Sequence, residues 1–111
     1  MVRRWSDAVA IRPRSGGVHP GHVLVVPRVH VPDAGTDLVV SAAMMARASV
    51  LMDEMPSANI ITSKGSDATQ TVFHAHWHVV PREPGDGLPL LWTPQQEARR
   101  QEQRWQPAGA R

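Results

Sequence analysis

The segment Thr71-Val-Phe-His-Ala-His-Trp-His-Val-Val80 places a histidine at every second position from residue 74 to residue 78. Its β-branched and aromatic residues favour a β-strand. Side chains alternate between the two faces of a strand, so we predict one shared face for the three histidines, His74, His76 and His78, with Val72 and Val80. The opposite face is apolar and is predicted to pack on the core: Phe73, Ala75, Trp77 and Val79.

Outward from this segment, the chain consists of short apolar runs separated by glycine and proline. We predict strands over residues 8–12, 22–27 and 58–62, the second of them central because it is apolar almost throughout. Loops rich in glycine or proline separate these runs. Mostly adjacent strands with one crossing helix predict an α+β fold with a mostly antiparallel sheet.

Two helices are also predicted, one in the middle of the chain and one near its end. The main helix is capped by Thr36 or Asp37 and ends near Glu54. Helical spacing predicts its core face: Leu38, Val40, Met45, Ala48, Leu51 and Met52. Thr93-Pro-Gln-Gln96 resembles a capping box at the start of a polar C-terminal helix that runs to about Trp105. We expect a domain over residues 1–92, then a polar helix and tail over residues 93–111 that frays from residue 107.

The composition limits the possible classes of protein. A chain of 111 residues is one domain with a single core, and the absence of cysteine excludes disulfides, thiolate zinc sites and cysteine nucleophiles. Because no apolar leader or membrane-spanning run is found, we predict a cytoplasmic protein with no membrane partner. The net charge is only +2. The basic residues near the C-terminus are predicted to be solvated rather than to bind nucleic acid: Arg99, Arg100, Arg104 and Arg111.

Three interpretations of the histidine row are open. The row could bind a metal, but the outer two Cα atoms of such a row lie roughly 13 Å apart in a strand. The rings could instead be ordinary hydrogen-bonded polar groups, an interpretation that suits His19 and His30. For the three triad histidines it would bury three imidazoles without a function, at a cost in desolvation free energy. In the third interpretation, which we favour, His76 attacks phosphorus and a neighbouring histidine assists the leaving group. Backbone amides and hydroxyls then hold the phosphoryl oxygens, and no metal or other cofactor is needed.

Two sequence blocks together resemble the signatures of the histidine-triad (HIT) family of nucleotide hydrolases and transferases. His74-Ala-His-Trp-His-Val-Val80 matches the family pattern of His-x-His-x-His followed by two apolar residues. Pro20-Gly-His-Val-Leu-Val-Val-Pro-Arg-Val-His-Val31 resembles the first conserved block of the family. The resemblance covers roughly residues 8–87. It implies a HIT-like α+β fold and a homodimer whose sheets continue across the interface.

The resemblance also implies roles for individual residues. His76 corresponds to the nucleophile that forms a covalent nucleotidyl-histidine, and His78 to the residue that contacts the phosphate and assists the leaving group. His74 corresponds to the residue that supports the site from behind, with His22 as its buried partner. The substrate-binding positions of the family fall on Ser63, Thr69, Gln70 and Thr71. Ser63 stands where relatives usually carry asparagine or glutamine, and Thr69 replaces a common glycine.

The chain departs from the family pattern on its N-terminal side. Relatives usually have a helix and a strand before the first block, and an acidic or amide residue that holds the ribose hydroxyls. Here the lead is short, and Pro13 or Arg14 takes that position. An arginine could face an added phosphate or another charged group. Trp92 could contribute to a pocket, but its setting after two leucines favours packing or an interface.

The third triad position is histidine rather than glutamine, so the chain resembles the hydrolase branch of the family. The implied function is hydrolysis at the α-phosphate of a nucleoside phosphoramidate or a dinucleoside polyphosphate, and the sequence does not separate these substrates. The rival hypothesis is a non-catalytic nucleotide-binding or interaction module with a degenerate base pocket.

Overall fold

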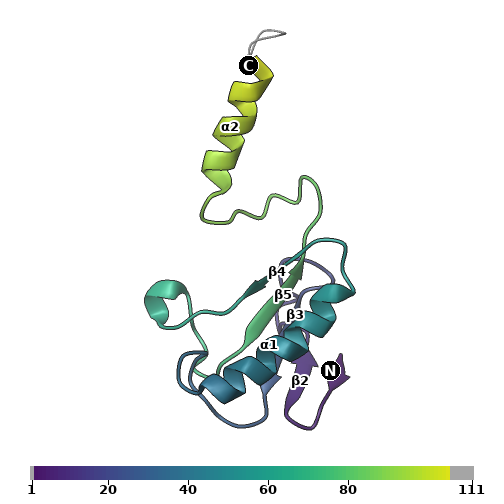
Figure 1. Cartoon of the computed structure of the whole chain (residues 1–111), viewed down its shortest axis with the longest axis vertical. Helices are drawn as coiled ribbons and strands as arrows, with labels where there is room; N and C mark the ends of the chain where they lie inside the picture. The colour runs from purple at the N-terminus through teal and green to yellow at the C-terminus, as the bar shows by residue number, and fades with distance from the viewer. Residues whose placement is uncertain (1, 106–111) are drawn as a thin grey trace.

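A computed structural model describes residues 2–105 and shows a five-stranded antiparallel sheet in the order β1-β2-β3-β5-β4 (Figure 1). The strands are β1 (Arg3–Arg4), β2 (Ala8–Ile11), β3 (Val23–Pro27), β4 (Ala58–Ile61) and β5 (Trp77–Pro81). The helices are α1 (Leu38–Asp53) and α2 (Thr93–Trp105), with a single 3-10 turn, η1 (Ser66–Ala68). The predicted α+β class is confirmed. β1 and η1 are additions that the sequence did not predict, and the predicted fraying from residue 107 lies outside the described residues.

Strand β3 lies in the middle of the sheet, as its apolar sequence predicted. It pairs with β2 on one side and with β5 on the other. Val23 and Val25 are buried on the face that α1 covers, whereas Leu24 and Val26 are half-buried on the opposite face. Leu24 pairs directly with His78 of β5, so the face opposite α1 is the one that carries the histidine.

Helix α1 begins after Asp37, whose side chain accepts hydrogen bonds from the amides of residues 39 and 40. The predicted core face was partly wrong. Ala48 and Leu51 are buried together with Met44, but Leu38 is 79% exposed and Met45 is 44% exposed. The buried residues follow i, i+4, i+7 spacing from Met44. Met45 lies one residue further on, about 100° around the helix at 3.6 residues per turn, and therefore faces outward.

The predicted strand over residues 71–80 is also only half right. The sheet ladder begins at Trp77, and residues 71–76 form a loop. Backbone groups of this loop bond outside the ladder: the amide of Ala75 donates to the carbonyl of Val31, and the hydroxyl of Thr62 donates to the carbonyl of His76. The predicted alternation of buried and exposed side chains therefore fails at both ends of the segment 71–80. Phe73 is 55% exposed instead of buried, and Val80, on the histidine face, is only 6% exposed.

The chain leaves β5 through a loop that Arg82 fixes. Its guanidinium donates to both carboxylate oxygens of Asp86, to the side-chain oxygen of Asn59 and to the carbonyl of Leu88. Helix α2 then projects away from the sheet (Figure 1). It begins at Thr93, as predicted within one residue, although the Thr93 hydroxyl accepts from the amide of Leu90. Within residues 2–105, no helix is long and apolar enough to cross a membrane.

Candidate functional site

The antiparallel pairing of β3 and β5 sorts the histidines into two pairs, one at each end of β3. His22 precedes β3 and meets His78, and the two ring nitrogens that face each other are 2.9 Å apart. His30 follows β3 and meets His74 at the same separation of 2.9 Å. The middle triad histidine, His76, lies between the pairs, with its ring centroid 5.1 Å from that of His78.

Hydrogen bonds to the backbone fix the tautomers of the first pair. The amide of Val18 donates to Nδ1 of His22 over 3.2 Å, so the ring proton of neutral His22 is on Nε2. That Nε2–H donates to Nδ1 of His78. In neutral His78 the remaining proton is therefore on Nε2, since each neutral imidazole carries one donor and one acceptor. His78 thus retains an N–H donor that makes no hydrogen bond within residues 2–105.

Gly17 makes the Val18 contact possible. Its φ of 71° lies in the left-handed region, which glycine adopts without steric cost. A Cβ at this position would lie only 2.4 Å from Nδ1 of His22. Glycine is therefore favoured at position 17 both by its backbone conformation and by its close approach to the His22 ring.

His76 has the opposite arrangement. Its Nδ1 lies 2.8 Å from the carbonyl of His74, and a carbonyl can only accept, so Nδ1 carries the proton. Nε2 of neutral His76 is left with a free lone pair. The site thus presents a nucleophilic nitrogen on His76 next to an N–H donor on His78.

His74 is held at the far end of the site. Its Nε2–H donates to the carbonyl of Pro27 over 2.9 Å, so its Nδ1 accepts from Nδ1–H of His30. The predicted partner of His74 was His22, and this was wrong. His22 is diagonal to His78 across β3 and β5, a separation that ring side chains can span, and it lies at the other end of β3 from His74. His30, which sequence reasoning treated as an ordinary satisfied histidine, is the actual partner.

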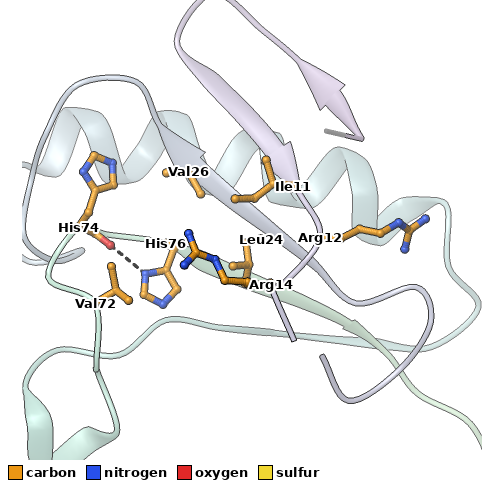
Figure 2. A pocket seen from close by; sticks show the side chains of 8 residues that line it. All are labelled: Ile11, Arg12, Arg14, Leu24, Val26, Val72, His74 and His76. Carbon is orange, nitrogen blue, oxygen red and sulfur yellow. Dashed lines mark hydrogen bonds between the residues drawn. The ribbon is translucent and has the colours of Figure 1, made fainter. Parts of the chain in front are cut away.

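An apolar cavity of about 630 Å³ opens on this face of the sheet (Figure 2). His74 and His76 line one side of it, whereas His78 and His22 do not line it. The remaining wall is formed by Ile11, Arg12, Arg14, Leu24, Val26 and Val72. The volume lies within the roughly 300–1,000 Å³ range of small-molecule sites, which are mostly apolar with a few polar groups.

The four predicted substrate-binding residues lie outside the cavity lining. Gln70 is buried, and its side chain holds the loop together: it accepts from the amide of Gly65 and donates to the carbonyls of Pro32 and Val72. The backbone amide of Gln70 donates to the carbonyl of Gly65. Gln70 therefore shapes the loop before the triad. Ser63 is half-buried, and Thr69 and Thr71 are exposed.

Thr69 is the one non-glycine residue with positive φ, 69°, in the described part of the chain. A left-handed conformation costs an L-residue roughly 1–2 kcal/mol, and a β-branched side chain suits it poorly. We expect Thr69→Gly to raise the free energy of unfolding by about 1 kcal/mol, because relief of this strain exceeds the added entropy of the unfolded chain. Urea denaturation measures the change. Thr71→Gly, without that strain, is the matched control and should be neutral or destabilising. Equal effects of the two variants would contradict the strain argument.

Burial, and then the proximity of His76 and His22, lower the pKa of His78 to about 4. Burial, with a smaller contribution from His19, also lowers the pKa of His22. Both rings are therefore neutral at pH 7, as their hydrogen-bonded tautomers require. Among residues 2–102, no group of three or more histidine or carboxylate side chains is arranged to hold a metal ion.

The lowered pKa of His78 predicts how stability depends on pH. The unfolded ring titrates near pH 6.5 and the folded ring near pH 4, so the unfolded state binds more protons between these values. The free energy of unfolding should therefore fall as the pH is lowered from 6.5 to 4. His78→Gln should lose less stability over this interval, since one of the shifted groups is gone. Chemical denaturation at a series of pH values tests this, and identical slopes for the two proteins would contradict it.

The fold and site together define a small α+β domain in which a histidine cluster faces an apolar cavity. Comparison with known proteins identifies the family to which this domain belongs. The sequence matches the HIT domain model over residues 5–85, so the chain belongs to the HIT family. An uncharacterised HIT-like protein of Mycobacterium tuberculosis is 35% identical over 91 residues, which cover 70% of this chain and 63% of that protein.

Two further relatives connect the chain to a named activity and to a solved structure. The asymmetrical bis(5′-nucleosyl)-tetraphosphatase of Schizosaccharomyces pombe is 36% identical over 74 residues, which cover 60% of this chain and 41% of that enzyme. A crystal structure from Streptococcus mutans superimposes with a TM-score of 0.70 at 30% identity, over 93% of this chain and 74% of that one. The chain thus spans less than two thirds of the length of both curated relatives described here.

Proposed function

We propose that this protein is a nucleotide hydrolase of the hydrolase branch of the family, acting at the α-phosphate of a nucleoside phosphoramidate or a dinucleoside polyphosphate. One observation carries the proposal: the 2.8 Å contact of His76 Nδ1 with the His74 carbonyl leaves the Nε2 lone pair free beside the cavity that His76 lines. A histidine oriented in this way is an activated nucleophile. The activity of the tetraphosphatase from Schizosaccharomyces pombe supports the substrate class.

In the first step, Nε2 of His76 forms a bond to the α-phosphorus, and the bond from phosphorus to the leaving nitrogen or oxygen breaks. The His74 carbonyl stabilises the positive charge that develops on the His76 ring. His78 is neutral, so its Nε2–H acts as a hydrogen-bond donor to the leaving atom. The proton that the leaving atom gains comes from solvent.

In the second step, water attacks phosphorus, the bond to Nε2 breaks and the nucleoside monophosphate leaves. The attacking water returns one proton to solvent, which balances the proton taken up before. His22 and His30 do not touch the substrate in this scheme. They set the tautomers of His78 and His74, and they are positioning residues.

Subunit organisation is part of the proposal. β4 forms one edge of the sheet, with Ile61 40% exposed at its end. An exposed edge offers unpaired backbone groups to another strand. A homodimer with a continuous sheet, which the family resemblance implies, can form by pairing of two β4 edges.

Turnover by the full chain tests the proposal against the non-catalytic alternative. The protein is incubated with adenosine 5′-phosphoramidate and, separately, with diadenosine tetraphosphate, and the release of AMP is followed by chromatography. The proposal predicts steady release of AMP from at least one of the two. Saturable binding of both compounds with no release of AMP would favour a nucleotide-binding module.

A further inference from the structure

The cavity beside His76 is positively charged at its rim. Two guanidinium groups, those of Arg12 and Arg14, stand among its lining residues, and no carboxylate does. Ile11, Leu24, Val26 and Val72 supply only apolar surface, and the rings of His74 and His76 are the neighbouring polar groups on the wall. A ligand that fills this cavity therefore meets apolar surface, one nucleophilic imidazole and an excess of positive charge.

The guanidinium groups of the two arginines differ in their hydrogen bonds and in their direction. The guanidinium of Arg12 donates to the carbonyl of Pro20, and Figure 2 shows it directed away from the histidines. The guanidinium of Arg14 is directed toward the side of the cavity that carries His76 (Figure 2). Within the described residues, the Arg14 side chain makes no ion pair or hydrogen bond. Arg14 thus presents unused donors in a geometry suited to phosphate.

In Figure 2 the Arg14 guanidinium lies near His76 and the apolar side chains of the same cavity, so a nucleotide bound there would pass close to it. With the α-phosphorus at Nε2 of His76 and the base against the wall formed by Leu24 and Val26, the sugar lies between them. On this basis, and resting on the proposed function, we propose that Arg14 binds a second phosphate carried on the sugar. The substrate class is then a nucleoside 5′-phosphate derivative that is also phosphorylated on its 2′ or 3′ oxygen.

Binding of four adenosine nucleotides to the full chain, measured by titration calorimetry at pH 7, tests this inference. The probes are AMP, ADP, and adenosine 2′,5′- and 3′,5′-bisphosphate. ADP is the matched ligand, because it adds a phosphate at the 5′ end instead of on the sugar. We expect at least one bisphosphate to bind tenfold or more tightly than AMP and ADP, as a hydrogen-bonded charge pair gives.

Two variants assign the effect to a residue. Arg14→Gln should abolish the preference for the bisphosphate and leave AMP binding nearly unchanged. Arg12→Gln removes one positive charge from the same rim and should retain the preference. Equal affinity of the wild-type protein for AMP and both bisphosphates would overturn the inference. So would an equal loss of AMP and bisphosphate binding in Arg14→Gln, which would place Arg14 on the 5′-phosphate.

These equilibria do not depend on turnover, so the two proposals can fail separately. A protein that selects the bisphosphate through Arg14 but hydrolyses neither adenosine 5′-phosphoramidate nor diadenosine tetraphosphate contradicts the proposed hydrolysis alone. A protein that hydrolyses adenosine 5′-phosphoramidate but shows no preference for a phosphorylated sugar contradicts the role of Arg14 alone.

Discussion

Replacing His76 by alanine is expected to lower kcat for hydrolysis of adenosine 5′-phosphoramidate by roughly 10⁴-fold or more, because the covalent route is lost with its nucleophile. The His74 carbonyl holds Nδ1 of His76, and no other described ring is shown to present a free Nε2 lone pair to the cavity. KM should change much less than kcat, since the apolar wall of the cavity is untouched. Steady-state kinetics with the purified variant measures both constants.

His19→Asn is the matched control for that experiment. His19 lies outside the cavity lining, and its Nδ1 accepts from the amide of Gly21, a contact that an asparagine oxygen can replace. This variant should keep kcat within a few fold of the wild-type value. A His76→Ala protein that retains a tenth or more of wild-type activity would contradict the assignment of the nucleophile.

The largest effect on stability is expected at Trp77. Its side chain is only 3% exposed in the core formed by the sheet and α1. Truncation of a buried tryptophan to alanine costs roughly 3–5 kcal/mol, because the transfer free energy is lost and a cavity remains. Domains of this size have about 5–15 kcal/mol in total, so Trp77→Ala should be close to unfolding at 37 °C. Urea and thermal denaturation measure the loss.

Trp92→Ala provides the comparison with the same chemical change. Trp92 is 52% exposed, and surface substitutions usually change stability by less than about 0.5 kcal/mol. The sequence left open whether Trp92 contributes to a pocket, and it is not among the residues that line the cavity beside His76. Equal destabilisation by the two variants would show that Trp92 packs in an interface, for example between two subunits.

The sequence predicted the elements of the fold better than their contacts. Turn residues and apolar runs located β2, β3, β4 and both helices within one or two residues. The predicted core face of α1 is rotated relative to the observed one. Met44 and Met45 are equally apolar, and only the position of the sheet determines which of the two is buried. The first half of the histidine segment was predicted as strand because its composition is strand-like. Tertiary hydrogen bonds, such as that from the Ala75 amide to the Val31 carbonyl, override that preference.

The same limit applies to the site. Alternating spacing identified His76 as the nucleophile candidate with His78 beside it. It could not show that His22 pairs with His78 and that His30 pairs with His74, because those pairs follow from the antiparallel register of β3 and β5. Nor could it show which of Pro13 and Arg14 lies in the cavity lining. That depends on where the chain turns after β2, and Arg14 is the one that lines the cavity.

A covalent adduct on His76 is the most direct test of the mechanism. The wild-type protein is mixed with adenosine 5′-phosphoramidate, quenched within milliseconds to seconds in alkaline denaturant, which preserves phosphorus–nitrogen bonds, and digested for mass spectrometry. The proposed mechanism predicts one AMP group, attached to His76 and released by mild acid. Turnover without any adduct on His76, or an adduct on a different residue, would contradict it.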